Sequence, residues 1–168
     1  MLKSLRESNL VSRGRQRHAR YLGKGRWAEI SGTIAVGVGI LTMLERLLDS
    51  VILIDHFNKV EMATAFIAGI DPLKTAISVI SYAEILVGLD DEAARKAKAL
   101  LNHYEILSID ASIAEKAAEL RRSYKWKLPD AFQAALALSY QIKLCTRNTR
   151  DFNPEKHLFV EIPYELKD

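Results

Sequence analysis

The chain has 168 residues, a length that fits one domain with an extension and that can bury a core without disulfides. Residues 1–28 carry eight lysines and arginines against one acid, whereas residues 29–168 carry 16 basic and 20 acidic residues. The basic isoelectric point therefore arises from residues 1–28. It does not indicate a basic binding face on the folded part.

The single cysteine bears on the cellular compartment in which the protein is expected. The only cysteine, Cys145, lies in an apolar run and excludes a disulfide within the chain. Free cysteines of this kind are usually small core residues, and their presence without partners indicates a reducing compartment. We therefore expect Cys145 to be buried and the protein to be cytoplasmic.

The first 42 residues differ in composition from the rest. Six of the eight glycines fall between Gly14 and Gly39, and all four prolines lie beyond residue 70. Residues 1–28 lack periodic apolar spacing and indicate either a solvated basic tail or an RNA-binding arm. The apolar stretch 30–42 is shorter than the ~20 residues that cross a bilayer, so we expect no membrane association.

Met43 precedes the first strand-like run and marks the predicted domain boundary. Residues 1–42 are expected to be a basic, glycine-containing N-terminal extension, either disordered or the result of a misassigned start. Residues 43–168 are expected to form the folded domain.

From Met43 onward, short β-rich runs alternate with helical stretches, a pattern typical of a parallel sheet flanked by helices. Strands are predicted at 44–48, 75–80, 105–109, 143–147 and 158–162. Helices are predicted at 90–102, 110–122 and 129–139. The helix at 90–102 begins with acidic residues and continues with basic ones, as the helix dipole favours. Asp110 is a typical N-cap residue, and Pro129 suits the first turn of a helix. Residues 51–54 are ambiguous, because their β-branched side chains favour a strand continuing from Leu48.

Four acids lie at the ends of the predicted elements. Asp49 interrupts an apolar stretch, Glu84 is expected in the first helical turn after the strand at 75–80, and Asp130 and Asp151 repeat the arrangement. Each has a structural alternative as a cap, a turn residue or a partner of the helix dipole. Together, they predict a cluster of carboxylates at one edge of a parallel sheet. Clustered carboxylates repel one another unless cations or protons neutralise them. Oxygen ligands favour Mg²⁺ or Mn²⁺ over zinc.

Other chemistries have less support. The sequence contains no HExxH, G-x-S-x-G or P-loop pattern, and its four histidines show no paired ligand spacing. Tyr124 and Trp126 stand among four basic residues, which suits either RNA stacking and phosphate contacts or a wetted loop around a half-buried tryptophan.

Four ordered segments resemble the PIN-domain family, and in particular the VapC-type toxin ribonucleases of type II toxin–antitoxin systems. Residues 47–55 resemble the opening strand with its catalytic aspartate, 77–86 the glutamate-bearing segment, 127–137 the third acidic motif, and 144–152 the last. The resemblance covers nearly all of 43–168. It implies an α/β three-layer sandwich with a five-stranded parallel sheet flanked by helices, and it makes residues 51–58 helical.

The resemblance also implies a site and a chemistry. Its catalytic, metal-binding acids would be Asp49, Glu84, Asp130 and Asp151, with Ser50, Thr146 and Asn148 as supporting residues. Val51 stands where many relatives carry Asn, and Asn148 where they often carry Asp, which predicts a weakened second cation site. Ser50 and Thr146 have an alternative reading as ordinary turn and strand-end hydroxyls.

The expected function is Mg²⁺- or Mn²⁺-dependent hydrolysis of RNA phosphodiester bonds by the toxin of a toxin–antitoxin pair. The expected partners are an RNA substrate, a cognate antitoxin and a second copy of the chain. Two alternatives stay open, namely a housekeeping PIN nuclease without an antitoxin, and a catalytically silent PIN-like module that only binds RNA or protein.

Overall fold

The computed structural model describes residues 43–166. They form an α/β domain around a five-stranded sheet in which every strand pair is parallel, with the order β3-β2-β1-β4-β5. The strands are β1 (Arg46–Leu48), β2 (Thr75–Ser78), β3 (Glu105–Leu107), β4 (Lys143–Cys145) and β5 (Val160–Glu161). The strand order reverses at β1, which makes its carboxyl end the place where an open α/β sheet forms a crevice. The predicted extension 1–42 lies outside the described residues.

All five predicted strands are present, but each is shorter than predicted. At β2 the cause is a helix that begins early, because a polar residue at the end of the strand caps it. Ser78 ends β2, and its hydroxyl accepts a hydrogen bond from the Ser81 amide at 2.9 Å. Helix α3 therefore begins at Val79, inside the predicted strand 75–80. β-branched residues alone could not reveal this cap.

Six helices connect the strands within the described residues. They are α1 (Ser50–Phe57), α2 (Glu61–Gly69), α3 (Val79–Val87), α4 (Asp91–Leu101), α5 (Ala111–Tyr124) and α6 (Leu128–Tyr140), with a short 3₁₀ turn at Pro72–Lys74. Helices α4, α5 and α6 match the predicted ranges. The carboxylate of Asp110 caps α5 as predicted, accepting a hydrogen bond from Ile113 N at 2.9 Å. Asp90, which was expected at the helix start for its charge, also caps α4 by accepting a hydrogen bond from Ala93 N at 2.8 Å.

The ambiguous run 51–54 belongs to α1, as the family resemblance implied. Ile52 and Leu53 are fully buried, whereas Ile54 is partly exposed. Packing on one face of a helix thus outweighs the strand preference of β-branched side chains. Helix α2 lay in no predicted element.

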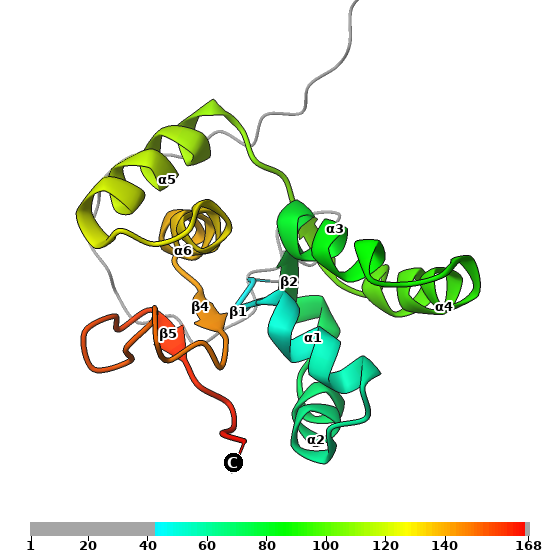
Figure 1. The fold of residues 1–168 in the computed structure, drawn as a ribbon. Coiled ribbons are helices and arrows are strands. Elements are labelled where there is room, and N and C mark those ends of the chain that lie inside the picture. The colour runs from blue at the N-terminus through cyan, green and yellow to red at the C-terminus, as the bar shows by residue number, and fades with distance from the viewer. Residues whose placement is uncertain (1–42, 167–168) are drawn as a thin grey trace, which may run out of the picture. The chain divides into compact units, whose positions relative to one another are not determined.

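The core has two halves, one on each face of the sheet. Leu47 and Leu144 point toward α5 and α6, whereas Leu48 and Cys145 point toward the side of α1, α3 and α4. Adjacent strand residues face opposite sides, so both faces of the sheet are covered. Figure 1 shows the resulting layers, with α5 and α6 on one side of the strands and α1 to α4 on the other.

Two further expectations concern burial. Cys145 is fully buried, as predicted. Trp126 is 5% exposed and packs against Phe152, so it is a core residue rather than the half-buried side chain of a wetted loop or a platform for RNA. No helix within residues 43–166 is long and apolar enough to cross a bilayer.

Candidate active site

Asp49 lies at the carboxyl end of β1, the central strand. It occupies the N-cap position of α1, but its side chain makes no capping hydrogen bond. Its carboxylate instead accepts a hydrogen bond from the Thr146 hydroxyl at 2.6 Å and a longer one from Ser50 at 3.4 Å. Burial raises the pKa of Asp49, against the Thr146 hydrogen bond, and the charge of Glu84 raises it further. Asp49 thus stands at the N-cap position but directs its side-chain hydrogen bonds to Thr146 and Ser50 rather than to the helix backbone.

Glu84 reaches the site from α3, which follows β2. It is the sixth residue of α3 and lies in the second turn, whereas the sequence placed it in the first. The cause is the early start of α3 at Val79, which follows the Ser78 cap. From the second turn of α3, the Glu84 carboxylate lies close enough to raise the pKa of Asp49 and of Asp130 through its charge.

Asp130 stands in the first turn of α6, as predicted, and is half-buried. Its pKa is raised to about 6, first by burial and then by the charges of Asp151, Asp49 and Glu84, against the opposing charge of Lys127. A carboxylate shifted in this direction lacks enough positive charge nearby. The four predicted acids therefore act on one another electrostatically, although they come from four separate segments.

A cleft of about 420 Å³ brings three of the four acids together. Asp49, Glu84 and Asp130 line it, and so do the supporting residues Ser50 and Asn148. Val51, Pro129, Gln133, Arg147, Thr149 and Arg150 complete the lining. The cleft opens where β1, α3, α6 and the loop after β4 meet, at the carboxyl end of the parallel strands, where ligands bind in such sheets.

The last predicted motif lies in the loop after β4, and its acid lies farther from the cleft than the other three. Asp151 is not among the residues that line the cleft, and its carboxylate accepts a hydrogen bond from the Asn148 amide at 2.9 Å. Its carbonyl accepts one from the Trp126 indole at 2.8 Å. The Asn148 backbone amide in turn donates to the Thr146 hydroxyl at 3.0 Å. This loop thus links Asp151 to Asp49 through two intermediates.

A buried polar network, which the sequence pattern did not predict, joins the elements that carry the acids. The Ser81 hydroxyl donates to the Leu48 carbonyl at 3.3 Å and accepts a hydrogen bond from the Gln133 amide. Leu48 precedes Asp49, Ser81 shares α3 with Glu84, and Gln133 shares α6 with Asp130. A polar residue three positions after Asp130 in a helix rich in alanine and leucine was the available signal for Gln133.

The donor set fits a hard divalent cation. It consists of three carboxylates and the Gln133 Oε1, which is buried and has no hydrogen-bond partner among residues 43–166. No three His, Cys, Asp or Glu side chains in that range are already arranged around a single ion position. Mg²⁺ does not require such a cage, because it keeps several waters and uses one or two carboxylates together with substrate phosphates.

Comparisons with known proteins identify relatives of this fold. The family model for the PIN domain matches residues 46–153. A toxin–antitoxin complex from Klebsiella pneumoniae contains a chain with 36% identity and a TM-score of 0.66, covering 73% of this chain and 100% of that one. No curated protein matches the chain.

Two more distant structures share the fold. FitAcB from Neisseria gonorrhoeae is 22% identical, with a TM-score of 0.61, over 72% of this chain and 99% of that one. VapBC-1 from nontypeable Haemophilus influenzae is 21% identical, with a TM-score of 0.58, over 71% and 98%. The parallel sheet, the acids at its carboxyl end and the family match over most of the described residues lead to one conclusion: the chain belongs to the PIN-domain family.

Proposed function

We propose that this protein is a divalent-cation-dependent endoribonuclease and the toxin of a toxin–antitoxin pair. The observation that carries the proposal is the cleft in which Asp49, Glu84 and Asp130 meet without enough positive charge to neutralise them. Membership of the PIN family, whose domains are generally nucleases, supports hydrolysis of a phosphodiester bond. The similarity to a chain of the Klebsiella complex supports the pairing with an antitoxin.

The proposed roles follow from the positions of the side chains. Asp49, Glu84 and Asp130 would hold Mg²⁺ or Mn²⁺, and Asp151 would contribute from the loop after β4 through its charge. A bound cation supplies an activated water and neutralises charge on the phosphate. The Thr146 hydroxyl orients the Asp49 carboxylate through its 2.6 Å hydrogen bond, and Asn148 fixes Asp151 in the same way.

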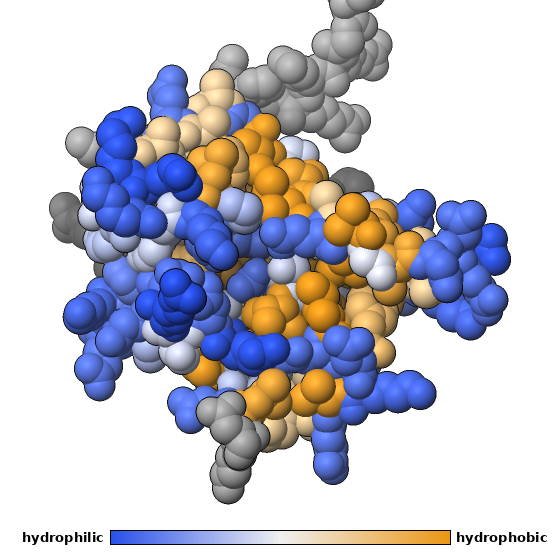
Figure 2. Space-filling model, viewed as in Figure 1, coloured by the Kyte–Doolittle hydropathy of each residue, from blue (hydrophilic) through white to orange (hydrophobic). Residues whose placement is uncertain are grey.

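The partners of the proposed toxin are an RNA substrate, an antitoxin and a second copy of the chain. Apolar side chains are exposed on α1 and α3, where Ile54, Val79 and Val87 are 38%, 36% and 88% exposed. Figure 2 shows hydrophobic residues gathered over α3, while hydrophilic residues cover the outer end of α4. Exposed apolar patches of this kind often mark protein-binding surfaces.

The deciding experiment is an RNA-cleavage assay with the purified full chain. A mixture of labelled single-stranded and structured RNAs is incubated with Mg²⁺, Mn²⁺, Ca²⁺ or EDTA, and the products are separated by size. We expect endonucleolytic fragments with Mg²⁺ or Mn²⁺ and none with EDTA. Cleavage that persists in EDTA contradicts the proposed chemistry, and absence of cleavage with every cation favours a silent binding module.

Toxin and housekeeping roles are separated by expression. Induction of the wild-type chain should arrest bacterial growth, whereas induction of Asp130→Asn should not. Co-expression of a short reading frame found beside the gene should restore growth and co-purify with the chain. Normal growth with an active nuclease indicates a housekeeping enzyme instead.

A further inference from the structure

Outside the acidic cluster, one buried ionic group borders the cleft. Asp55 on α1 is 5% exposed and accepts two hydrogen bonds from one guanidinium, from Arg147 Nε and from Nη2 at 3.0 Å. Tyr164, which is also buried, donates its hydroxyl to the same carboxylate at 2.9 Å. Neither Asp55 nor Tyr164 lines the cleft, but Arg147 does.

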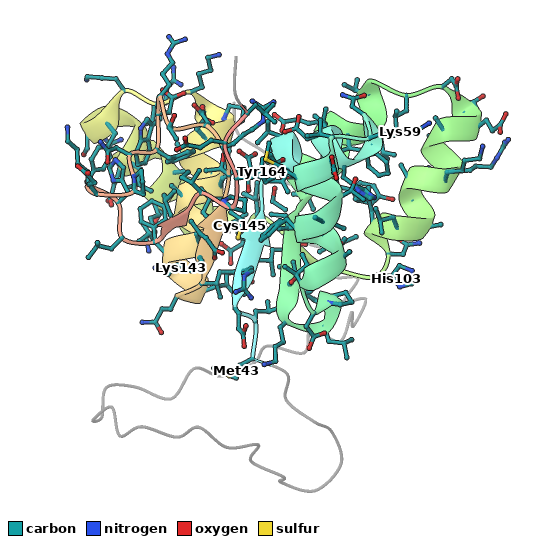
Figure 3. The ribbon with its side chains drawn as sticks, turned by 90° about the horizontal axis from the view of Figure 1, so that it is seen from below. Met43, Lys59, His103, Lys143, Cys145 and Tyr164 are labelled. Carbon is teal, nitrogen blue, oxygen red and sulfur yellow. The ribbon has the colours of Figure 1, made fainter. Side chains whose placement is uncertain are left out.

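This cluster, Asp55–Arg147–Tyr164, is placed at the same end of the sheet as the acids. Figure 3 shows Tyr164 at the end of the sheet opposite Met43 and Lys143, which lie where β1 and β4 begin. Arg147 follows Thr146 directly, and Thr146 bonds Asp49. The Arg147 side chain is 34% exposed and lines the cleft.

In this cluster the Arg147 guanidinium is fixed by a buried carboxylate, unlike a simple surface ion pair. Burial works against ionisation of Asp55, but the hydrogen bonds from Arg147 and Tyr164 and the Arg147 charge outweigh it and lower the pKa of Asp55. The pair uses two of the five N–H donors of a guanidinium. A planar guanidinium fixed along one edge is well suited to bind a phosphate along another.

We propose that Arg147 is a phosphate-binding residue, held by Asp55 and Tyr164 at the rim of the acidic cleft so that it contacts an RNA backbone phosphate beside the carboxylates. The cleft needs such a group because its carboxylates repel a polyanion. Fixing the guanidinium in advance reduces the entropy lost when RNA binds. This inference rests on the proposed function, because it assigns the residue to binding of the same RNA.

Arg150 provides a matched control. It lines the same cleft and carries the same charge, but it is exposed and forms no ion pair with any residue in the range 43–166. Removal of either arginine subtracts one positive charge from the cleft. Only removal of Arg147 deletes a cation held in a fixed orientation.

The test measures KM and kcat for RNA cleavage by the full chain with Mn²⁺, and RNA affinity by fluorescence anisotropy in EDTA at several salt concentrations. Arg147→Gln should raise KM about 10- to 100-fold, the range expected for lost charge-assisted hydrogen bonds, with kcat changed less than about 3-fold. It should also lower the salt slope of binding by about 0.7, the value for one phosphate contact on a single strand. Arg150→Gln should change KM less than about 3-fold, as expected for a mobile surface charge.

Two further variants separate charge from orientation. Arg147→Lys should restore the salt slope but not KM, because an ammonium cannot bond both Asp55 and a phosphate in a fixed plane. Asp55→Asn removes a negative charge, which by itself would strengthen RNA binding. If Asp55 positions Arg147, this variant should instead raise KM by roughly 3- to 10-fold. It also stays informative if Arg147→Gln fails to fold.

The outcomes distinguish this inference from the proposed function. Cleavage with a normal KM in Arg147→Gln, or equal losses in the Arg147 and Arg150 variants, overturns the phosphate-binding role alone. Unchanged or tighter RNA binding by Asp55→Asn overturns the positioning role of Asp55. Arg147-dependent RNA binding without cleavage by any cation supports the inference and contradicts the nuclease. Absence of RNA binding contradicts both.

Discussion

Asp130 and Asp55 are both carboxylates removed from bulk water, yet their protonation equilibria shift in opposite directions. Burial and three neighbouring acids raise the pKa of Asp130 to about 6. Asp55 is more buried, but Arg147 and Tyr164 hydrogen-bond to it, and its pKa is lowered. The chain thus supplies a close counter-ion to Asp55, whereas burial and the acidic neighbours of Asp130 outweigh the opposing charge of Lys127. We propose that an external cation completes the cleft, whereas the Asp55 cluster is complete within the protein.

The largest expected effect is on catalysis. Asp49→Asn, Glu84→Gln and Asp130→Asn should each reduce Mn²⁺- or Mg²⁺-dependent cleavage by more than about 100-fold. Mutation of a residue that only hydrogen-bonds to a metal ligand already costs about 10–100-fold in activity, and loss of a ligand itself should cost more. Asp151→Asn should have a milder effect, since Asp151 does not line the cleft. The assay is initial-rate cleavage of a labelled RNA, with circular dichroism to check the fold.

Asp90→Ala is the control for these variants. Asp90 caps α4 through a 2.8 Å hydrogen bond to Ala93 N and stands apart from the cleft. Its loss should lower stability by about 1 kcal/mol, as for other caps, and leave cleavage unchanged. Reduced stability with normal cleavage in a cleft variant would reject the metal-site role of that acid.

The next largest effect is on stability at the other carboxylate. Asp55→Ala leaves the Arg147 guanidinium and the buried Tyr164 hydroxyl without their acceptor, so it should lower the free energy of unfolding by roughly 2–4 kcal/mol. Urea unfolding followed by tryptophan fluorescence measures this loss. A loss under about 0.5 kcal/mol, the range of ordinary surface substitutions, would show that Asp55 is no better paired than a surface carboxylate.

A smaller effect concerns pH in the absence of divalent cations. Asp130 has a pKa of about 6 in the folded domain and an ordinary value of 3.8, so the folded state binds more protons between these values. Its contribution to stability should therefore fall as pH rises from about 4 to about 6. Asp130→Asn removes that fall, and in EDTA at pH 7 it should be more stable than wild type by something on the order of 1 kcal/mol.

Thermal melting of wild type and Asp130→Asn across pH 4–8 measures the difference, and added Mg²⁺ should reduce it. Asp49 shifts in the same direction and Asp55 in the opposite one, so only the difference between the two proteins isolates Asp130. A wild type that is as stable as the variant at pH 7 in EDTA would mean that the cleft acids are already neutralised within the chain.

The smallest effect is expected from removing residues 1–42. We propose that the domain folds from Met43, because residues 43–166, as the structure describes them, contain a five-stranded sheet and a core on both of its faces. A chain starting at Met43 should melt within a few degrees of the full chain and show a shallower salt dependence of RNA binding, since eight basic residues are lost. Insolubility of the shortened chain would place the apolar stretch 30–42 in the core or an interface.

The sequence predicted the sheet and the positions of its acids because both follow from local patterns. Apolar runs bounded by turn residues located the strands, and acids at the ends of separate elements were expected at the carboxyl edge of a parallel sheet. The start of α3 was missed because it depends on a cap hydrogen bond at Ser78. Glu84 was placed one turn too early for that reason.

The polar contacts between distant segments could not be predicted from the sequence. Arg147 and Asp55 are 92 residues apart, and Tyr164 and Asp55 are 109 apart, so no local spacing announces their contact. Asp55 itself directly follows the run 51–54, which was ambiguous between strand and helix. The Ser81–Gln133 bond spans 52 residues and has the same character. Such contacts depend on how elements pack, which one sequence read along its length does not reveal.

Whether the cleft acids receive their counter-ion from outside the chain can be measured by titrating metal-free protein with Mn²⁺ in an isothermal calorimeter at pH 7.5. We expect saturable binding by wild type and by Arg150→Gln. Binding should be weakened at least about tenfold in Asp49→Asn and Asp130→Asn, in line with the loss of a metal-site group. Equal affinity in wild type and both aspartate variants would contradict this expectation.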